Sequence, residues 1–537
     1  MRKPFVFLPL LCGAMLAAGI LLGSFLQSGG SFGFNRDGSG KVSDSREAIA
    51  KINAVLKFVQ ENYVDTVNPD QLADKTLVAM LQSLDPHSDY FTADQIKAMT
   101  EPLQGNFEGI GIEYNFLRDT LVVMDVIAGG PSEKAGLQSG DRIIRANDTL
   151  LVGKFASEKF VRGKLRGPKD TKVVVTVKRP SKALPFTVSI TRGSIPIYSV
   201  ETAYMADAET GYIRLSRFAE TSYDEFMKAA DSLSQLGMKK MILDLRSNGG
   251  GYLSAATDIA DEFLPAGKKI VYTKGRVDGE NMTMATSKGR YEKMPLAILV
   301  DENSASASEI VAGAIQDNDR GLIIGRRTFG KGLVQQEKRL NDGSAFRLTI
   351  ARYYTPTGRC IQKPYDKGLA AYEADEENRF KHGELLNRDS IHFDDSLKFK
   401  TPGGRVVYGG GGIMPDVFVP LDTAGGSEYL NSLFYKNIFT IWALDYTAKN
   451  KSKLETMGLE KFRTSFAVTD ELVNALVEAG EKNGVKRNDM QLRRSQAMIK
   501  RYIKANIARG VWGDDGYFIV WNDTDEVLKI ALEELKK

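Results

Sequence analysis

The chain has 537 residues, which is enough for several domains with separate hydrophobic cores. Its 72 basic and 68 acidic residues leave a net charge of +4, which argues against a strongly polyanionic partner such as a nucleic acid. Only two cysteines are present, Cys12 and Cys360, and no HExxH pair occurs, which excludes a disulfide framework and the common zinc motifs. We therefore expect a multidomain protein that uses no metal and no cofactor.

An uncharged run of 23 residues, positions 4–26, follows Arg2 and Lys3. As a helix it would extend about 34 Å, against about 30 Å for the hydrocarbon core of a bilayer. Basic residues at the start keep that end in the cytoplasm, so we predict a signal anchor over residues 1–27, a single pass through a bacterial inner membrane and a body in the periplasm. A cleaved signal peptide is the alternative, and the sequence leaves open whether the segment is removed. The Gly- and Ser-rich residues 28–44 are predicted to be a flexible linker.

Residues 45–104 are predicted to form a helical arm. Apolar residues recur at helical spacing from Ser45 to Tyr63, and a second helix is expected from Asn68 to Leu84. The polar turn Asp85-Pro86-His87-Ser88-Asp89 ends that helix, and we expect a structural role for His87.

Residues 105–192 are predicted to form short strands and one helix. Gly109-Ile110-Gly111-Ile112 resembles the carboxylate-binding loop of PDZ domains, in which glycines let backbone N–H groups face a peptide carboxylate. The segments Gly130–Leu137 and Gly140–Ile143 follow in the order expected for that fold. The resemblance implies a PDZ domain that binds protein substrates with free apolar C-termini, Ile110 and Ile112 forming the apolar wall.

From Gly211 onward, predicted strands alternate with predicted helices. The strands are expected at Gly211–Ser216, Met241–Leu245, Ile270–Thr273, Leu296–Val300 and Leu322–Ile324, and helices at Ser222–Leu236 and Ala307–Gln316. This alternation indicates an α/β fold with a largely parallel sheet. Active sites in such sheets lie at the carboxyl ends of the strands, and Asp244–Gly251 and the serines after Val300 follow such strand ends. Asn341-Asp342-Gly343 predicts a hairpin farther on.

Three serines, Ser304, Ser306 and Ser308, lie at the junction between the strand ending at Val300 and the next helix. A hydroxyl there lies near free backbone N–H groups and the positive end of the helix dipole, which suit a developing oxyanion. Helix capping explains one such serine, and the residues alone leave open which of the three is a nucleophile. No histidine is near in sequence, so a Ser–His–Asp triad is possible only by distant assembly. A lysine of lowered pKa can also act as the base, and Lys331 is the candidate.

The segment Gly325–Lys331 also fits the G-x-x-x-x-G-K frame of a phosphate-binding loop. Gly332 stands where the Ser or Thr that holds Mg²⁺ would be, and no obvious helix start follows it. We therefore favour a catalytic lysine over a nucleotide site.

Together these motifs resemble the carboxyl-terminal processing peptidases, the tail-specific proteases of family S41. Lys331 lies 25 positions and Gln335 lies 29 positions after Ser306, and the resemblance extends from about Glu47 to Pro420. Members of the family are Ser–Lys proteases with a PDZ domain inserted into a crotonase-like α/β core. The resemblance implies that Ser306 is the nucleophile, that Lys331 is the general base and that Gln335 orients the lysine amine.

The same resemblance implies residues that support the active site. The segment Asp244–Gly251 is similar to the part of the family core that faces the serine, although the family usually has Pro-Gly-Gly after the asparagine and this chain has three glycines. Residues implied to build the oxyanion hole or to support the site are Ala307, Gly249, Gly250, Asp244, Arg246 and Glu309. The peptidase core is expected over residues 193–424 and the PDZ domain over 105–192.

Residues 425–537 are predicted to form a mostly helical C-terminal extension. Apolar residues share one face from Leu492 to Ile507, with basic residues elsewhere, which favours a packed or dimerising helix over a membrane or nucleic-acid surface. Family members use the N-terminal arm to dimerise or to brace the core, so the sequence leaves open whether the protein forms a homo-oligomer. Two other functions compete with an envelope endopeptidase, namely a catalytically silent PDZ scaffold and a crotonase-like enzyme acting on thioesters.

Overall fold

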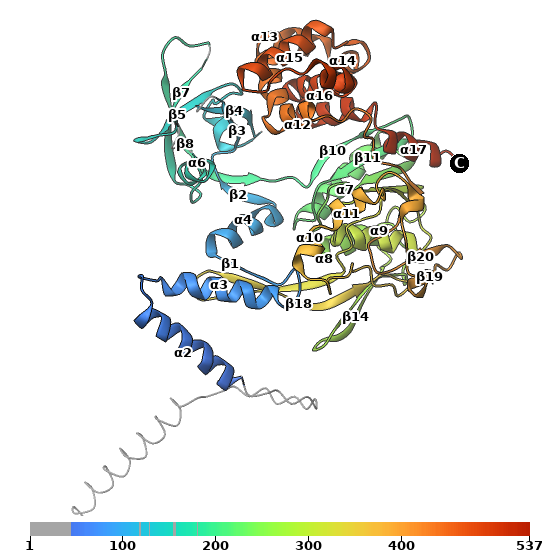
Figure 1. The fold of residues 1–537 in the computed structure, drawn as a ribbon. Coiled ribbons are helices and arrows are strands. Elements are labelled where there is room, and N and C mark those ends of the chain that lie inside the picture. The colour runs from blue at the N-terminus through green and yellow to red at the C-terminus, as the bar shows by residue number, and fades with distance from the viewer. Residues whose placement is uncertain (1–44, 118–119, 128, 154–156, 180) are drawn as a thin grey trace, which may run out of the picture. The chain divides into compact units, whose positions relative to one another are not determined.

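The computed structural model describes residues 45–117, 120–127, 129–153, 157–179 and 181–537. The chain divides into two compact units, residues 1–73 and residues 74–537. In the first unit, α2 (Arg46–Asn62) agrees with the helix predicted from Ser45 to Tyr63, and its apolar side chains, such as Ile52 and Val55, are exposed. Helix α3 (Pro69–Gln82) begins in the first unit and ends in the second. Both helices are blue in Figure 1.

The predicted membrane location has to be corrected. Among the residues that the structure describes, no helix is both long and apolar enough to cross a bilayer. A single-pass location in the inner membrane, and with it that membrane as a partner, is therefore not supported. The run at positions 4–26, on which the prediction rests, and the predicted linker 28–44 lie outside the described residues.

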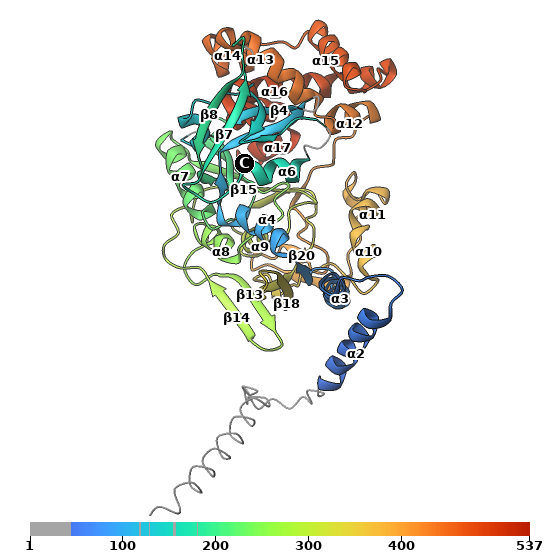
Figure 2. The same ribbon diagram turned by 90° about the vertical axis from the view of Figure 1, so that its left-hand side faces the viewer.

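A six-stranded antiparallel sheet follows α4 (Ala93–Gln104) and β2 (Asn106–Gly109). Its order is β3-β4-β5-β7-β8, with β6 beside β5. The elements are β3 (Ile112–Leu117), β4 (Thr120–Val126), α5 (Pro131–Lys134), β5 (Arg142–Ala146), β6 (Thr149–Leu150), α6 (Glu158–Leu165), β7 (Lys172–Lys178) and β8 (Phe186–Thr191). Alternate side chains of β7, namely Val173, Val175 and Val177, are fully buried, as the two-residue period of a strand requires. The sheet is drawn in cyan and teal in Figure 2, and β9 (Gly193–Pro196) then pairs with β2.

The largest core is built around a second six-stranded sheet of order β10-β11-β12-β15-β16-β21, parallel except for the β10–β11 pair. Its strands are β10 (Val200–Met205), β11 (Thr210–Leu215), β12 (Lys240–Asp244), β15 (Leu296–Val300), β16 (Leu322–Gly325) and β21 (Val417–Phe418). One face, which includes Ile213 and Leu243, packs with side chains of α7 (Ser222–Gln235), α8 (Leu253–Asp261) and α9 (Ala307–Asp317). The other face, which includes Tyr212 and Ile242, packs with α17 (Glu526–Glu534). Because both faces are covered, the central strand β15 is apolar and buried at every position, as is usual for a strand inside a parallel sheet.

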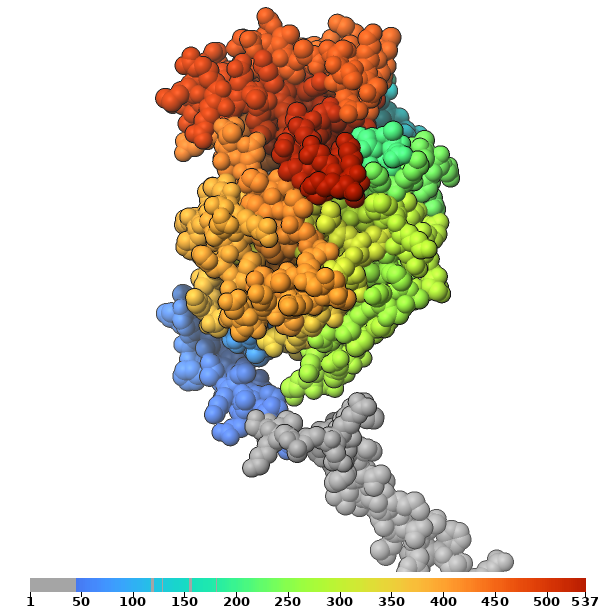
Figure 3. All heavy atoms as spheres, turned by 90° about the vertical axis from the view of Figure 1, so that its right-hand side faces the viewer, coloured from blue at the N-terminus to red at the C-terminus, as the bar shows by residue number. Residues whose placement is uncertain are grey.

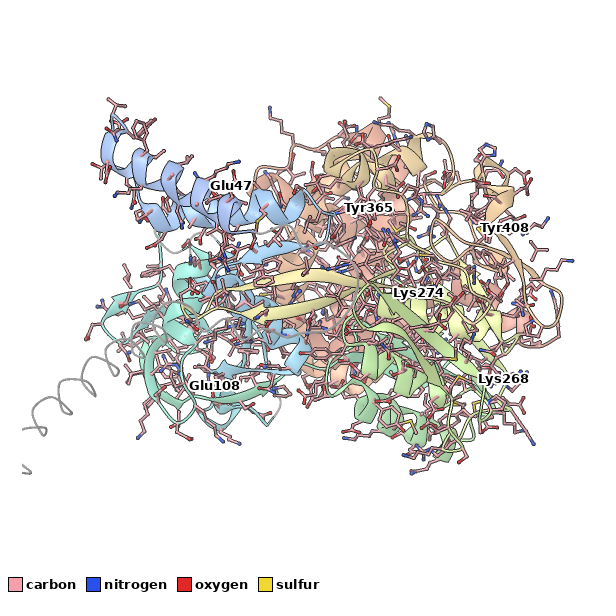
Figure 4. The ribbon with its side chains drawn as sticks, turned by 90° about the horizontal axis from the view of Figure 1, so that it is seen from below. Glu47, Glu108, Lys268, Lys274, Tyr365 and Tyr408 are labelled. Atoms are coloured by element: carbon pink, nitrogen blue, oxygen red, sulfur yellow. The ribbon has the colours of Figure 1, made fainter. Side chains whose placement is uncertain are left out.

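A third sheet is antiparallel and lies outside this core sheet. Its order is β1-β18-β13-β14 with β17 also on β18, the strands being β1 (Asp89–Phe91), β13 (Lys269–Gly275), β14 (Gly279–Met284), β17 (Leu333–Arg339) and β18 (Ala345–Tyr354). The strand predicted at Ile270–Thr273 therefore exists, but it belongs here rather than in the parallel sheet, because it pairs with β14 and β18. Figure 4 shows the labelled Lys274 of β13 beside the yellow strands. The predicted hairpin at Asn341–Gly343 joins β17 to β18.

The C-terminal region is helical and has a core of its own. Its elements are α12 (Glu428–Tyr435), α13 (Ile438–Met457), α14 (Leu459–Ser465), α15 (Asp470–Lys482) and α16 (Asp489–Asn522), the last interrupted by non-helical backbone at Trp512 and Gly513. Before it come α10 (Leu369–Glu373), α11 (Asp375–Lys381), η1 (Arg388–Ser390), η2 (Asp395–Leu397), β19 (Lys398–Lys400) and β20 (Val406–Tyr408). Ile499, Ile503 and Ile507 are fully buried, which agrees with the packed helix predicted there. Figure 3 shows the dark-red C-terminal residues next to the green part of the core.

Candidate active site

The candidate site is built on a strand, a sharp turn and a helix. All five residues of β15 are buried, and after the turn that follows this strand α9 begins at Ala307. Ser306, the residue before the helix, has φ of 56°, a conformation that is uncommon for a residue with a Cβ. The turn is held in this strained conformation by the Ala305 N–H, which donates to the Asn248 carbonyl at 3.0 Å, and by the Ser306 N–H, which donates to Glu309 at 2.8 Å.

The three serines of the turn have different surroundings. Ser304 is fully buried, and its hydroxyl donates to the Leu245 carbonyl at 2.8 Å. Ser308 is also fully buried, and its hydroxyl donates to the Asn248 carbonyl at 2.8 Å. Both therefore fasten the turn to the loop after β12. Ser306 is half-buried and lines a pocket of about 840 Å³.

Lys331 and Gln335 line the same pocket as Ser306. The Lys331 Nζ donates to the Gln335 Oε1 at 2.9 Å, and the Gln335 Nε2 donates to the backbone carbonyl of His87. Burial, together with the positive charge of Arg347, lowers the pKa of Lys331 below its usual value. Among the described residues, no direct hydrogen bond joins the Lys331 amine to the Ser306 hydroxyl.

Glu309 connects the serine turn to the lysine turn. It is fully buried in the first turn of α9, and its Oε2 accepts the N–H groups of Ser306 at 2.8 Å and Lys331 at 2.9 Å. Its Oε1 accepts the Thr328 hydroxyl at 2.6 Å and the Gly330 N–H at 2.7 Å. Burial raises the pKa of this carboxyl to about 7, and the four donated hydrogen bonds limit the rise.

The glycines after Asn248 face the serine turn. Gly250 has φ of 100°, and a Cβ there would lie 2.8 Å from the Ala305 carbonyl oxygen, so only glycine allows the two loops to approach. The Gly250 N–H already donates to the Asn248 Oδ1 at 2.9 Å. Among the described residues, the N–H groups of Gly249 and Ala307 donate to no protein acceptor, and both residues line the pocket. These two donors are thus available to an oxyanion.

Asp244 and Arg246 lie behind the site rather than in the pocket. Asp244 is fully buried and accepts hydrogen bonds from Tyr212, Arg214 and Arg246. Although burial opposes ionisation, the two guanidinium groups hold the pKa of Asp244 well below its usual range. Arg246 also pairs with Asp525 at the start of α17, at 2.8 Å. This cluster fixes the loop that carries Gly249 and ties the C-terminal helix to the core.

The phosphate-loop alternative does not fit the surroundings of Gly330 and Lys331. Both N–H groups donate to the Glu309 carboxylate, whose negative charge would repel a phosphate. The chain continues into strand β17 instead of a helix. Within the described residues, no group of three or more histidine, cysteine or acidic side chains is placed to hold a metal ion.

A groove of about 550 Å³ lies between β3 and α6. Its lining includes Ile110, Gly111 and Ile112, and on the opposite side Leu165 and Arg166. Gly109, predicted with this loop, instead pairs with Gly193 in the β2–β9 ribbon. Arg166 lies over the Phe107 ring at 4.3 Å and forms an ion pair with Glu101 of α4, the helix whose last residues line the pocket of Ser306 and Lys331.

Comparison with known proteins decides the family. Residues 209–370 match the model of peptidase family S41, residues 122–179 match a PDZ domain, and residues 429–513 match a family of unknown function. The carboxy-terminal-processing protease of Bartonella bacilliformis is 36% identical over 319 residues, which cover 58% of this chain and 72% of that protein. The chain belongs to peptidase family S41. It is a carboxy-terminal processing serine peptidase with a PDZ domain.

A second relative, from Bacillus subtilis, agrees with this assignment. The carboxy-terminal processing protease CtpA of Bacillus subtilis is 35% identical over 328 residues, covering 60% of this chain and 68% of that one. Among solved structures, the photosystem II D1 C-terminal processing protease is 26% identical, with 70% of this chain and 93% of that chain covered and a TM-score of 0.35. The PDZ domain of a Vibrio cholerae carboxy-terminal protease, solved with a peptide, is 30% identical. The match covers 17% of this chain and 97% of that domain, with a TM-score of 0.16.

Sequence reasoning missed two residues of this S41 site. The Tyr353 hydroxyl shares its proton between the carbonyl of Ser306, at 3.1 Å, and the carbonyl of Lys331, so it fastens the serine turn and the lysine turn to β18. Thr328 donates to Glu309 and accepts the Ile413 N–H at 2.6 Å. Thr328 lies inside the Gly325–Lys331 motif and could have been noticed there. Tyr353 lies 22 residues beyond Lys331 in an ordinary strand, and no local signal marks it.

Proposed function

We propose that this peptidase cleaves by a Ser–Lys mechanism, with Ser306 as nucleophile, Lys331 as general base and Gln335 orienting the lysine. The observation that carries the proposal is that Ser306 is the one serine of its turn with a side chain in the pocket that Lys331 and Gln335 also line. Burial lowers the pKa of Lys331, which increases the fraction of neutral amine able to accept the hydroxyl proton.

In this mechanism the Ser306 Oγ transfers its proton to the Lys331 Nζ and bonds to the scissile carbonyl carbon. The carbonyl oxygen becomes an oxyanion, which the free N–H groups of Gly249 and Ala307 would stabilise. The lysine then gives its proton to the leaving amine, the C–N bond breaks, and water hydrolyses the acyl-enzyme with Lys331 again as base. Gly250 permits the close approach, and Asp244, Arg246 and Glu309 hold the loops.

The proposed architecture is a crotonase-like α/β core over residues 193–424. A PDZ domain over 105–192 is inserted before it, and a helical arm (45–104) and a helical extension (425–537) flank the two. Support comes from the parallel sheet, whose strand ends carry the glycine loop and Ser306. Metal and nucleotide take no part in the proposed chemistry.

We also propose that the PDZ groove selects substrates by a free apolar C-terminus. Ile110 and Ile112 are almost fully buried and offer an apolar wall, and Arg166, which is also paired with Glu101, lies at the groove, where its remaining N–H groups can donate to a carboxylate. Amidating the C-terminus of one substrate removes the negative charge of its terminal carboxylate and should slow its degradation. Equal rates for the free-acid and amidated forms, with neither bound by the protein, would remove this part of the proposal only.

The main test is degradation of an unfolded protein by the purified chain, beside the Ser306→Ala and Lys331→Ala variants. Each substitution should abolish cleavage, whereas chelators and nucleotides should leave it unchanged. Ser304→Ala is the matched control, because it removes a neighbouring hydroxyl that lies outside the pocket. Full activity in a folded Lys331→Ala protein would falsify the assignment of the base. A silent scaffold would degrade nothing, and a thioester enzyme would act on acyl thioesters instead.

A further inference from the structure

The turn formed by Asp85, Pro86, His87 and Ser88, here called the 85–88 turn, is far from the catalytic motifs in sequence but touches them in space. The Asp85 carboxylate accepts the N–H groups of His87 at 2.8 Å and Ser88 at 2.9 Å. It also accepts the Ser88 hydroxyl at 2.6 Å and the Thr349 hydroxyl at 3.0 Å. One carboxylate therefore fixes the shape of the turn and fastens it to β18.

Ser88 makes a second connection to the same strand. It is fully buried, and its hydroxyl oxygen accepts the Thr349 N–H at 3.0 Å. Thr349 is the direct cross-strand partner of Gln335 on β17, next to an irregularity in the register between Val334 and Gln335. The turn is thus attached to the position that faces Gln335.

The backbone carbonyl of His87 accepts the Gln335 Nε2. A carbonyl oxygen can only accept, so this contact requires the NH₂ end of the Gln335 amide to face His87. The Oε1 end must then face Lys331, where it accepts from the Nζ at 2.9 Å. If the amide turned around, its NH₂ would point at the lysine and would compete for the lone pair that must accept the serine proton.

The side chain of His87 is fixed as well. Its Nε2 lies 2.7 Å from the Tyr372 hydroxyl of α10, and the two rings pack edge to face. Burial, followed by the positive charge of Lys331, lowers the pKa of His87 to about 4, so the ring is neutral near pH 7. The charged groups that face the turn and the lysine are Asp85, Glu309, Lys331, Lys363 and Arg347.

We propose that the 85–88 turn is a positioning element of the catalytic site, which orients the Gln335 amide and through it the Lys331 amine. The inference rests on the proposed Ser–Lys mechanism. It gives Asp85 and Ser88 a role in the reaction rate, although neither side chain lines the catalytic pocket. Because the turn acts on the base and leaves the substrate-binding surface intact, its loss lowers kcat and leaves KM almost unchanged.

The test uses the full chain and the steady-state kinetics of one peptide substrate. Asp85→Asn keeps the size of the side chain. Its one oxygen can still accept from the two N–H groups and the Thr349 hydroxyl, but its NH₂ replaces the oxygen that accepts the Ser88 hydroxyl. This change should lower kcat by about ten- to a hundred-fold with KM within about two-fold. Thr349→Val removes only the hydroxyl donor and should lower kcat less, and Thr349→Ser, which keeps that donor, should restore it. Asp89→Asn, just outside the turn, is the matched control, and its kcat should stay at the wild-type value.

A double-mutant cycle separates positioning from a general structural role. If the turn acts through Gln335, Asp85→Asn should have little further effect on kcat in a Gln335→Ala background. The pH profile gives a second readout, because Asp85 holds the pKa of Lys331 up, so its neutralisation should move the acidic limb to lower pH.

The outcomes distinguish this inference from the mechanism on which it rests. Independent, multiplicative effects of Asp85→Asn and Gln335→Ala, or a wild-type kcat in both Asp85→Asn and Thr349→Val, would overturn the positioning role. If the Asp85→Asn protein does not fold, the kcat values of Thr349→Val and Thr349→Ser test the positioning role instead. Activity that survives in Lys331→Ala would instead overturn the mechanism.

Discussion

Replacing Glu309 tests the connection between the serine and lysine turns. In Glu309→Ala, the N–H groups of Ser306, Gly330 and Lys331 lose their acceptor in a buried site. An unsatisfied buried donor costs about 1–3 kcal/mol, so the loss should be about 3 kcal/mol or more, reduced where water enters the cavity. In Glu309→Gln, the amide oxygen can still accept from Ser306 and Lys331 while its NH₂ turns to Thr328. The Gly330 N–H and the Thr328 hydroxyl then lose their acceptor, which is two of the four donors that Glu309→Ala leaves without one.

Tryptophan fluorescence cannot follow this change, because Trp442, Trp512 and Trp521 all lie in the C-terminal helical region. Amide hydrogen exchange measured by mass spectrometry reports the opening free energy of the segments concerned. Protection over α9 and over positions 326–334 should fall in the order wild type, Glu309→Gln, Glu309→Ala. Glu209→Gln, which alters an exposed ion pair with Lys239, is the control and should leave that protection unchanged.

The same carboxyl predicts a pH dependence. Burial raises the pKa of Glu309 to about 7 in the folded protein, above its ordinary value of 4.5. The folded state therefore binds more protons between these values, so this group contributes its full stabilisation below pH 4.5 and loses it as the pH rises through 7. Glu309→Gln should flatten that part of the stability profile. Unchanged α9 protection in Glu309→Ala at every pH would refute the reasoning.

Three further outcomes are expected. If neutral Lys331 is the base, kcat/KM should rise with pH through the lowered pKa of the lysine, and a flat profile with chemistry limiting would contradict this. Ser304→Ala should cost about 1–2 kcal/mol of stability, measured by thermal unfolding, because the backbone N–H of Asp301 loses the Ser304 hydroxyl oxygen as its acceptor. Peptidase activity should stay close to wild type. Arg246→Met removes one of the two positive charges that neutralise the buried Asp244 and also removes the ion pair with Asp525, so α17 should exchange its amide hydrogens faster over 526–534. Unchanged exchange there would count against the role of the Asp525 ion pair.

Much of the local structure follows from the sequence. The continuous apolar run Leu296–Val300 predicts a strand buried on both faces, and β15 has the same bounds. The helix predicted at Ala307–Gln316 extends one residue farther, to Asp317, and the hairpin at Asn341–Gly343 joins two strands as expected. These predictions succeed because periodicity, turn chemistry and motif spacing are local properties of the chain.

Only the tertiary structure decides which groups meet. Three serines with the same spacing differ because two of them donate to carbonyls of the β12 loop, some 60 residues earlier, and one faces the pocket. The partner of the Gln335 amide is a carbonyl 248 residues away, at His87. The strand at Ile270–Thr273 joins the antiparallel sheet because β14 and β18 supply its hydrogen bonds, which its own apolar pattern does not encode. A residue type and its spacing determine what a side chain can do, whereas burial and distant partners determine which side chain does it.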